Sequence, residues 1–270
     1  MTGSSPYIQS LLEANPLREP VLRSIIRSLR LARGSRGLDV GCGIGLQALL
    51  LADAVGQAGR VTGVDIDPEL LAYGEQLARE AGLSDRIRFQ LGDMHRLPFE
   101  AAAFDWVWSA DCVGYPAGEL NVLLPELRRV VKPGGSLILL AWTSQQVLPG
   151  YPLLEPQLNA TCSSYQPFLA GKNPEQHFLR TARWLEAAGL EAVTARTFVG
   201  EVQAPLDDGQ RVALASLFKM LWVEPQPGAS TEVWREYQRL CAPASPDFIL
   251  NLPGYYAFFT YSVFRGRVPD

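Results

Sequence analysis

The fold is decided by the stretch GLDVGCGIG at residues 37–45, which is followed by VTGVD at residues 61–65. The first stretch is a short apolar strand that runs into a turn with three glycines at alternate positions. Glycine adopts positive φ angles and has no Cβ, so the backbone can bend sharply and a ligand can come close to it. An apolar helix pattern follows over residues 46–55, and the second strand ends in Asp65. A carboxylate at that strand tip can accept hydrogen bonds from a ribose diol, so the sequence predicts a site for a cofactor that contains a nucleoside.

The spacing of the glycines distinguishes between two classes of cofactor. A dinucleotide fingerprint reads G-x-G-x-x-G, and its third glycine would fall where this chain has Leu46. The pattern D-x-G-x-G-x-G over residues 39–45 instead resembles motif I of the class I S-adenosylmethionine (SAM) dependent methyltransferases. Three further stretches resemble the same family, especially its ubiquinone/menaquinone-biosynthesis type (methyltransferase type 11): GDMHRLPF at 92–99, FDWVWS at 104–109 and LRRVVKPGG at 127–135. The four motifs lie in the family's order between residues 37 and 142.

This resemblance implies an α/β fold, with a Rossmann-like, doubly wound sheet of seven mostly parallel strands, an antiparallel last strand and helical lid insertions. Strand and helix signals alternate from about residue 36 to 142, as βαβ units require. Asp67 and Pro68 are a cap and a first-turn residue for a helix that ends near Gly82. We expect its apolar face to consist of Leu70, Tyr73, Leu77 and Ala81.

Later segments extend this pattern. The stretch NPEQ at 173–176 is expected to be a capping box that opens a helix to Gly189. The last two strands are predicted at 193–202 and 256–268, and about fifty residues between them are too many for a hairpin turn. The expected organisation is an N-terminal helical cap at 1–34, a SAM-binding core at 35–145, a lid insertion at 146–175, a core helix and strand six at 176–202, a helical lid insertion at 203–254, and the final antiparallel strand at 255–270.

The resemblance also implies which residues contact the cofactor. They are Asp39, Gly41, Cys42, Gly43, Gly45, Asp65, Ile66, Asp93, Met94, Ser109 and Ala110. The glycine-rich loop would pass the methionine part of SAM, Asp65 would take the ribose hydroxyls, and Ile66 would pack on the adenine. Asp93 and the Met94 amide would bind the adenine edge, and Ser109 and Ala110 would lie beside the sulfonium. The alternatives are structural roles: Asp39 as a turn cap, Asp93 as a strand end and Asp67 as a helix cap.

Methyl transfer is an in-line displacement that requires mainly proximity, alignment and exclusion of water. Activation of the acceptor is less visible in the sequence, because a general base is identified by its reach and pKa. The candidate catalytic residues are His177, Asp111, Tyr115 and Tyr165, with a solvated first-turn histidine as the alternative for the first. His95 is expected to be a surface residue. No carboxylate cluster suggests a magnesium site, so no metal is expected.

Composition restricts the partners. The chain has 270 residues and a net charge of −4, and its one basic cluster is Arg23, Arg27, Arg30, Arg33 and Arg36. Because this spacing is largely helical, we interpret the cluster as a solvated helix face, and we expect no nucleic-acid partner. No apolar run reaches the length of a membrane span, and four scattered cysteines without a CxxC pair indicate a cytoplasmic protein. The aromatic residues of the insertions favour an acceptor with an apolar or aromatic part. A monomer or homodimer is expected.

The predicted function is transfer of a methyl group from SAM to an O, N or C atom of a small organic molecule, with S-adenosyl-L-homocysteine (SAH) as the product. Two other functions stay open. One is a SAM-binding scaffold or sensor without transferase activity, since its cofactor motifs would look the same. The other is a nicotinamide-dependent oxidoreductase, which Leu46 disfavours.

Overall fold

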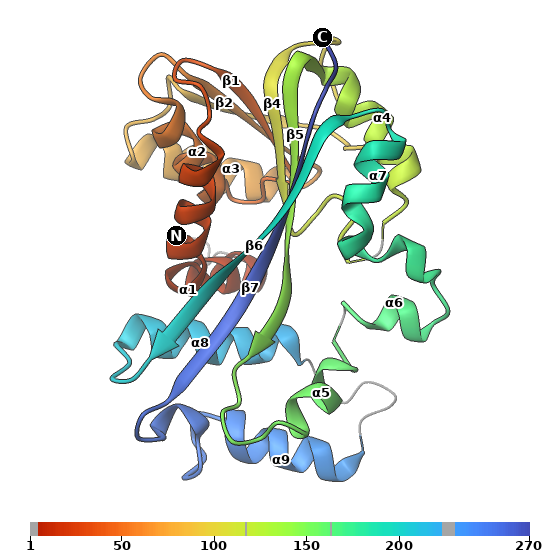
Figure 1. The fold of residues 1–270 in the computed structure, drawn as a ribbon. Coiled ribbons are helices and arrows are strands. Elements are labelled where there is room, and N and C mark those ends of the chain that lie inside the picture. The colour runs from red at the N-terminus through yellow and green to blue at the C-terminus, as the bar shows by residue number, and fades with distance from the viewer. Residues whose placement is uncertain (1–4, 117, 163, 223–229) are drawn as a thin grey trace. The chain divides into compact units, whose positions relative to one another are not determined.

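The computed structural model describes residues 5–116, 118–162, 164–222 and 230–270. Its strands are β1 (Arg36–Val40), β2 (Arg60–Asp65), β3 (Ile87–Leu91), β4 (Phe104–Ala110), β5 (Val131–Gln146), β6 (Glu191–Gln203) and β7 (Tyr256–Arg267). Its helices are α1 (Pro6–Leu29), α2 (Leu46–Val55), α3 (Pro68–Glu80), α4 (Leu120–Val130), α5 (Leu154–Asn159), α6 (Gln166–Leu169), α7 (Thr181–Ala187), α8 (Asp208–Leu221) and α9 (Thr231–Cys241). Three 3₁₀ turns, η1 (Pro174–Gln176), η2 (Phe178–Arg180) and η3 (Ile249–Asn251), complete the described elements (Figure 1).

The strands form a seven-stranded sheet in the order β3-β2-β1-β4-β5-β7-β6. The pairs among β3, β2, β1, β4 and β5 are parallel. Strand β7 is antiparallel to β5, because Val268 exchanges hydrogen bonds with Gly134 and Gly135, whereas Thr143 further along β5 meets the earlier Thr260. The predicted Rossmann-like sheet with an antiparallel last strand is therefore confirmed.

The chain divides into two compact units. The core unit comprises Leu22–Trp142, Asn173–Phe198 and Ser262–Asp270, and the helical unit comprises Met1–Val21, Thr143–Lys172 and Val199–Tyr261. Three strands, β5, β6 and β7, contribute residues to both units. The expected insertions at 146–175 and 203–254 include residues 163 and 223–229, which lie outside the described residues.

Apolar residues explain the packing of the core unit. Val107 and Leu139 on the sheet and Leu127 on α4 are fully buried in one cluster. Helix α2 is apolar on nearly all sides, as expected of a helix that is covered by other elements. The cap at Asp67 is confirmed, since its side chain accepts the Glu69 amide. The predicted apolar face of α3 is partly wrong: its buried residues are Leu70, Leu71, Gly74 and Ala78, while Tyr73 and Leu77 are half-buried and Ala81 is exposed.

Two local predictions are wrong. The segment after Asn173 is not one capped helix but two 3₁₀ turns followed by α7. The Asn173 side chain accepts the Glu175 amide, and His177 is extended (φ −67°, ψ 136°), which interrupts the helical hydrogen bonds. The arginine cluster is not one helix face either. Helix α1 ends at Leu29 because Arg30 takes a left-handed φ of 50°, so Arg30, Arg33 and Arg36 lie beyond it.

The helical unit has its own buried core. Asn159 Oδ1 accepts hydrogen bonds from Gln145 Nε2 at 2.8 Å and from Trp222 Nε1 at 3.0 Å. The Trp222 ring stacks near Phe218 and meets Tyr237 edge to face. These aromatic side chains, which the sequence analysis linked to an acceptor, are in this structure mainly packing within their own unit.

None of the helices in the described ranges is long and apolar enough to cross a membrane. The four cysteines, Cys42, Cys112, Cys162 and Cys241, are all free.

Candidate cofactor site

The glycine-rich turn lies in the core unit, between the end of β1 and the start of α2. Gly41, Gly43 and Gly45 have φ angles of 72°, 53° and 76°. These are left-handed angles, which residues with a Cβ adopt at a cost. The Gly41 amide donates to Val64 O at 2.9 Å, which joins the turn to β2. The backbone conformation of the turn is therefore by itself a sufficient reason for glycine at these three positions.

Close approach at two of these glycines is by protein atoms. A Cβ on Gly41 would lie 2.2 Å from Cys112 Sγ, and one on Gly45 would lie 2.5 Å from the Phe89 ring. The expectation that a missing Cβ makes room for a ligand is therefore not the whole reason for these glycines. They also allow β3 and the loop after β4 to pack against the turn.

Asp65 links the second strand to this turn. Its Oδ2 accepts the Gly43 amide at 2.9 Å and its Oδ1 accepts the Asp67 amide at 3.1 Å. A carboxylate has about four lone-pair sites, so both oxygens keep capacity for a further donor. The carboxylate thus stabilises the turn and can still accept hydrogen bonds from the two hydroxyl groups of a diol.

Asp39 is buried at the base of the turn. Its side chain is 2% exposed, and its Oδ2 has no hydrogen-bond partner among the described residues. Burial raises the pKa of Asp39 to about 8, and the charge of Asp65 adds to the shift. An unpartnered buried acceptor beside a second carboxylate fits a cationic ligand group, which would satisfy it and favour its charged form.

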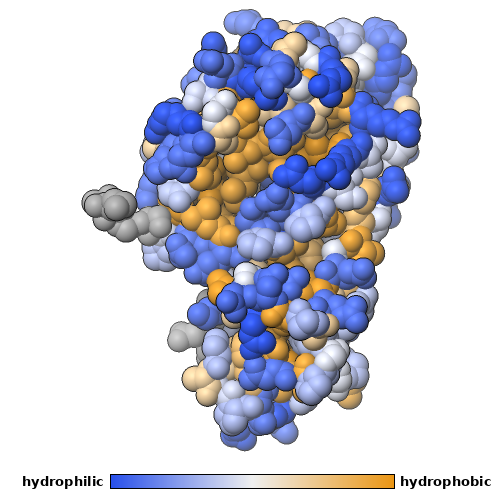
Figure 2. Space-filling view, turned by 90° about the vertical axis from the view of Figure 1, so that its left-hand side faces the viewer, coloured by the Kyte–Doolittle hydropathy of each residue, from blue (hydrophilic) through white to orange (hydrophobic). Residues whose placement is uncertain are grey.

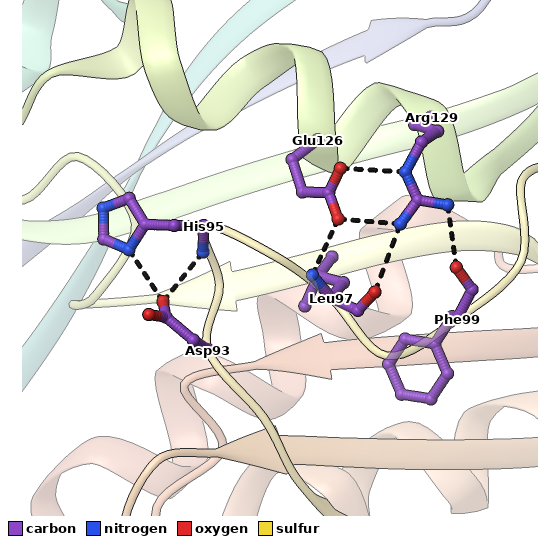
Figure 3. A network of polar contacts seen from close by, with 6 residues as sticks. All are labelled: Asp93, His95, Leu97, Phe99, Glu126 and Arg129. Atoms are coloured by element: carbon purple, nitrogen blue, oxygen red, sulfur yellow. Dashed lines mark hydrogen bonds and ion pairs between the residues drawn. The ribbon is translucent and has the colours of Figure 1, made fainter.

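The segment after β3 holds Asp93 in a tight turn (Figure 3). Asp93 Oδ1 accepts the His95 amide at 2.9 Å and contacts His95 Nδ1 at 2.7 Å. The hydrogen bond from the His95 amide contributes most, and the contact with the His95 ring contributes next. Together they hold the pKa of Asp93 below its usual value. Both side chains are more than half exposed, so His95 is a surface residue as expected. Met94 is half-buried against the apolar cluster.

Two residues of α4 hold the next part of this segment (Figure 3). Glu126 Oε1 accepts the Leu97 amide at 2.7 Å, and Arg129 donates to Phe99 O at 2.7 Å and to Leu97 O at 3.2 Å. Glu126 and Arg129 are themselves joined by two bonds of 2.7 and 2.8 Å. This Glu126–Arg129 pair, which the sequence analysis missed, fixes the chain four residues after Asp93. A carboxylate and an arginine three residues apart in a helix are too common to have indicated it.

Apolar residues are exposed where β2 and β3 end. Ile66 is 68% exposed and Leu91 is 54% exposed, and Leu91 pairs in register with Asp65. Figure 2 shows that one side of the molecule has apolar residues gathered in its upper half, among hydrophilic ones. Leu91 is not among the residues that the sequence indicated for the cofactor.

The side chains at the end of β4 are buried or hydrogen-bonded to the protein itself. Ser109 is buried, and its Oγ accepts the Val113 amide at 3.2 Å, while Ala110 is 8% exposed. Asp111 has a left-handed φ of 51°, and its Oδ1 accepts the Trp142 amide at 2.7 Å. Asp111 therefore joins the loop after β4 to β5.

Two of the four candidate catalytic residues belong to neighbouring segments. The Tyr115 ring meets Phe178 edge to face at 5.9 Å, and the Phe178 amide donates to Pro116 O. His177, the residue before Phe178, is half-buried; its Nδ1 accepts the Leu179 amide at 3.3 Å, and burial lowers its pKa. Tyr165 belongs to the helical unit and is 46% exposed, with a pKa raised by partial burial.

Comparisons with known proteins identify the family of this chain. A family model described as "Methyltransferase domain" matches residues 38–135. Demethylmenaquinone methyltransferase of Bacillus cytotoxicus is 31% identical over 199 residues, which cover 67% of this chain and 81% of that protein. Probable chloroplastic tocopherol O-methyltransferase of Oryza sativa subsp. japonica is 35% identical over 132 residues, but the match spans 47% of this chain and only 36% of that protein.

A solved structure shows the same fold. The SAM dependent methyltransferase from Aquifex aeolicus superposes with a TM-score of 0.53 at 22% identity, covering 70% of this chain and 89% of that one. Since the Bacillus relative is matched over four fifths of its length, the chain belongs to the class I SAM-dependent methyltransferases.

Proposed function

We propose that the protein transfers the methyl group of SAM to an O, N or C atom of a small organic molecule with an apolar or aromatic part. One observation carries the proposal. At the carboxyl edge of the parallel strands, Asp65, whose carboxylate keeps capacity for further donors, and Asp39, whose buried Oδ2 has no partner among the described residues, lie with the exposed Ile66 and Leu91. Ligands of open α/β sheets bind at this edge.

The residues present fit SAM. Asp65 would hold the ribose, and Ile66 and Leu91 would cover the adenine, whose edge Asp93 and the Met94 amide would bind. Asp39 would face the positive charge of the ligand through the turn at residues 41–45. When bound, SAM supplies an electrophilic methyl group, so the protein's residues serve mainly to bind, orient and exclude water.

On the acceptor side, we propose Tyr115 and His177 as the groups that hold or move a proton. They belong to segments in contact with each other, and a half-buried histidine of lowered pKa is neutral near pH 7. Asp111, which is bonded to β5, would position this loop. Tyr165 and the segments 146–175 and 203–254 are proposed to determine which acceptor is used.

Calorimetric titration with SAM and SAH tests the cofactor. We expect Asp65→Ala to weaken SAH binding by about a hundredfold, because hydrogen bonds to a charged group contribute about 1.5–3 kcal/mol each and the turn also loses its tie. Asp85→Ala, which removes an exposed carboxylate outside the site, is the matched control. Absence of SAH binding in the unaltered protein, or displacement by a nicotinamide dinucleotide instead, would refute the proposal.

Turnover of SAM with a radiolabelled methyl group tests the activity. A library of phenols, quinols and amines should contain an acceptor that becomes labelled. His177→Gln and Tyr115→Phe should then lower kcat with little change in the affinity for SAH. Tight SAH binding without transfer to any acceptor would favour the sensor function instead.

A further inference from the structure

The core unit holds a cavity at the opposite edge of the sheet from the cofactor residues. Its volume is about 540 Å³, within the usual range of small-molecule sites. It is lined by the chain between α1 and β1, by the starts of β4 and β5, and by Arg265 of β7. In β1, Arg36 begins the strand at this edge and Val40 ends it at the other, a separation of about 13 Å at the rise of a strand.

Positive charge predominates in this cavity. Its charged lining residues are Arg30, Arg33, Lys132, Arg265 and Asp105. This is unusual for a chain with a net charge of −4. A concave site lined by one sign of charge concentrates ions of the other sign.

The single carboxylate among the described lining residues is already occupied. Asp105 Oδ1 bonds Lys132 Nζ at 2.7 Å, and its Oδ2 accepts the Arg36 amide at 2.7 Å. Partial burial opposes ionisation of Asp105, but these contacts together outweigh it and lower the pKa, so the group stays ionised and paired. Asp105 therefore compensates the charge of Lys132, and the charges of the three arginines are left without a carboxylate among the described lining residues.

The arginines have no carboxylate partner among the described residues. Arg265 donates to Ser136 Oγ at 2.9 Å and to Leu29 O at 3.2 Å, and both acceptors are neutral. No ion pair or side-chain hydrogen bond of Arg30 or Arg33 is found within the described ranges, and both side chains belong to exposed residues. Three guanidinium groups thus share one cavity with their charge uncompensated.

Guanidinium groups recognise phosphate through paired, charge-assisted hydrogen bonds. Ser136 and Ser35 add hydroxyl groups to the lining, and the indole of Trp106, bonded to Ser35 Oγ, adds an apolar surface. We propose that this cavity binds a phosphate group, carried either by a free phosphate ester or by a lipid headgroup, independently of the cofactor site. Because the arginines converge on a cavity and do not follow a helix, a compact phosphate fits better than an extended polyanion.

Titration with inorganic pyrophosphate tests the proposal, with calorimetry or tryptophan fluorescence as the readout. We expect saturable binding that the double substitution Arg30→Gln/Arg33→Gln weakens by about tenfold or more, because each lost guanidinium removes charge-assisted hydrogen bonds to the phosphate. Arg183→Gln, which removes an exposed arginine of α7, should leave it unchanged within about twofold. SAH binding should be the same in all three proteins, which shows that the variants fold.

A second experiment, with lipid vesicles, distinguishes a lipid headgroup from a free phosphate ester as the carrier of the phosphate. Binding to phosphatidylglycerol vesicles but not to phosphatidylcholine vesicles, lost in the double variant, would identify a headgroup site. Pyrophosphate binding without vesicle binding would identify a free phosphate ester. Failure of both probes to bind, or equal binding by the double variant, would overturn the proposal.

Discussion

The two edges of the sheet in the core unit differ in charge although the same strands form both. At the carboxyl edge, the strand ends and the loops after them carry Asp39, Asp65, Asp93 and Asp111. At the amino edge, the cavity has Arg30, Arg33 and Arg265, with one paired carboxylate. The first arrangement suits a cationic sulfonium ligand and the second suits an anion.

The difference lies in how each edge satisfies its charges. At the carboxyl edge, backbone amides donate to Asp65 and Asp93, so these carboxylates also shape the turns that hold them. At the amino edge, the side chains of Arg30 and Arg33 hold no backbone group within the described ranges. A substitution at the first edge should therefore alter both folding and binding, whereas one at these two arginines should alter binding alone.

The largest effects should come from two glycines, one toward each edge. A Cβ at Gly37 would lie 2.0 Å from the Trp106 ring, which belongs to the amino-edge cavity, and one at Gly41 would lie 2.2 Å from Cys112 Sγ. We expect Gly37→Ala and Gly41→Ala each to lower the free energy of unfolding by about 3 kcal/mol, because overpacking of a rigid neighbour forces shifts. Urea denaturation measures this change.

Gly82→Ala is the matched control for these variants. Gly82 has a left-handed φ of 68° with open space around it, so its substitution reports backbone strain alone, about 1 kcal/mol. SAH affinity should fall in Gly41→Ala and pyrophosphate affinity in Gly37→Ala. If both variants lost both ligands equally, the two edges would not be separable.

An effect of comparable size, but with a pH signature, should follow from Asp39→Asn. Folded Asp39 keeps its proton up to a pKa of about 8, whereas the unfolded residue releases it near 3.8. Between these values the unfolded state binds fewer protons, so the free energy of unfolding falls as pH rises, by up to about 1.4 kcal/mol per pH unit. The amide that replaces the carboxyl group has no proton to lose, so the variant should be less sensitive to pH.

Urea denaturation at pH 5, 6.5 and 8 without ligand compares the two proteins. The amino edge should contribute no such slope, since its arginines do not titrate in this range. An unchanged slope in Asp39→Asn would mean that Asp39 is not neutral in the folded protein.

The glycine-rich turn and the cap at Asp67 could be predicted because each depends on local residue types: glycine at positive φ, or a capping oxygen. The seven-stranded sheet followed from the family resemblance of the four motifs. The prediction of one helix for the segment 173–189 was wrong. The Asn173 side chain accepts the amide of Glu175, two residues on, and His177 has an extended backbone that interrupts the helix. The cluster around Arg30 was mispredicted as a helix face, because a single left-handed residue ended α1 without a glycine or proline to announce it.

The site was less predictable than the fold. Asp65 ends a strand and Ile66 follows it in a recognisable motif, so the sequence indicates both residues as candidates. The Glu126–Arg129 pair and the cavity at Arg265 instead depend on tertiary contacts between segments about 30 to more than 100 residues apart. Such pairings leave no periodic pattern, and only the packed sheet brings them together.

The Glu126–Arg129 pair should have a moderate effect on the carboxyl edge alone. Glu126→Gln removes the charge that holds Arg129 against the segment after Asp93 while keeping an acceptor for the Leu97 amide. Because Arg129 is partly exposed, we expect a stability change of about 1 kcal/mol or less and a loss of SAH affinity of about fivefold. Amide hydrogen exchange should become faster at residues 93–99. Glu186→Gln on α7 is the control, and an unchanged exchange rate would show that the pair does not hold this segment.

The smallest effect is expected at the amino edge, where Asp105→Asn should change the affinity for pyrophosphate. Asp105→Asn keeps an acceptor for the Arg36 amide but removes the charge that compensates Lys132. If the amino-edge cavity selects phosphate by its positive charge, losing its carboxylate should strengthen pyrophosphate binding by about threefold, since a partly exposed ion pair contributes about 0.2–1 kcal/mol. SAH binding, about 13 Å away along the strands, should not change.

The same calorimetric titration measures both ligands. Weaker pyrophosphate binding in Asp105→Asn would mean that Asp105 orients Lys132 for the ligand, and that geometry matters more than net charge at this edge.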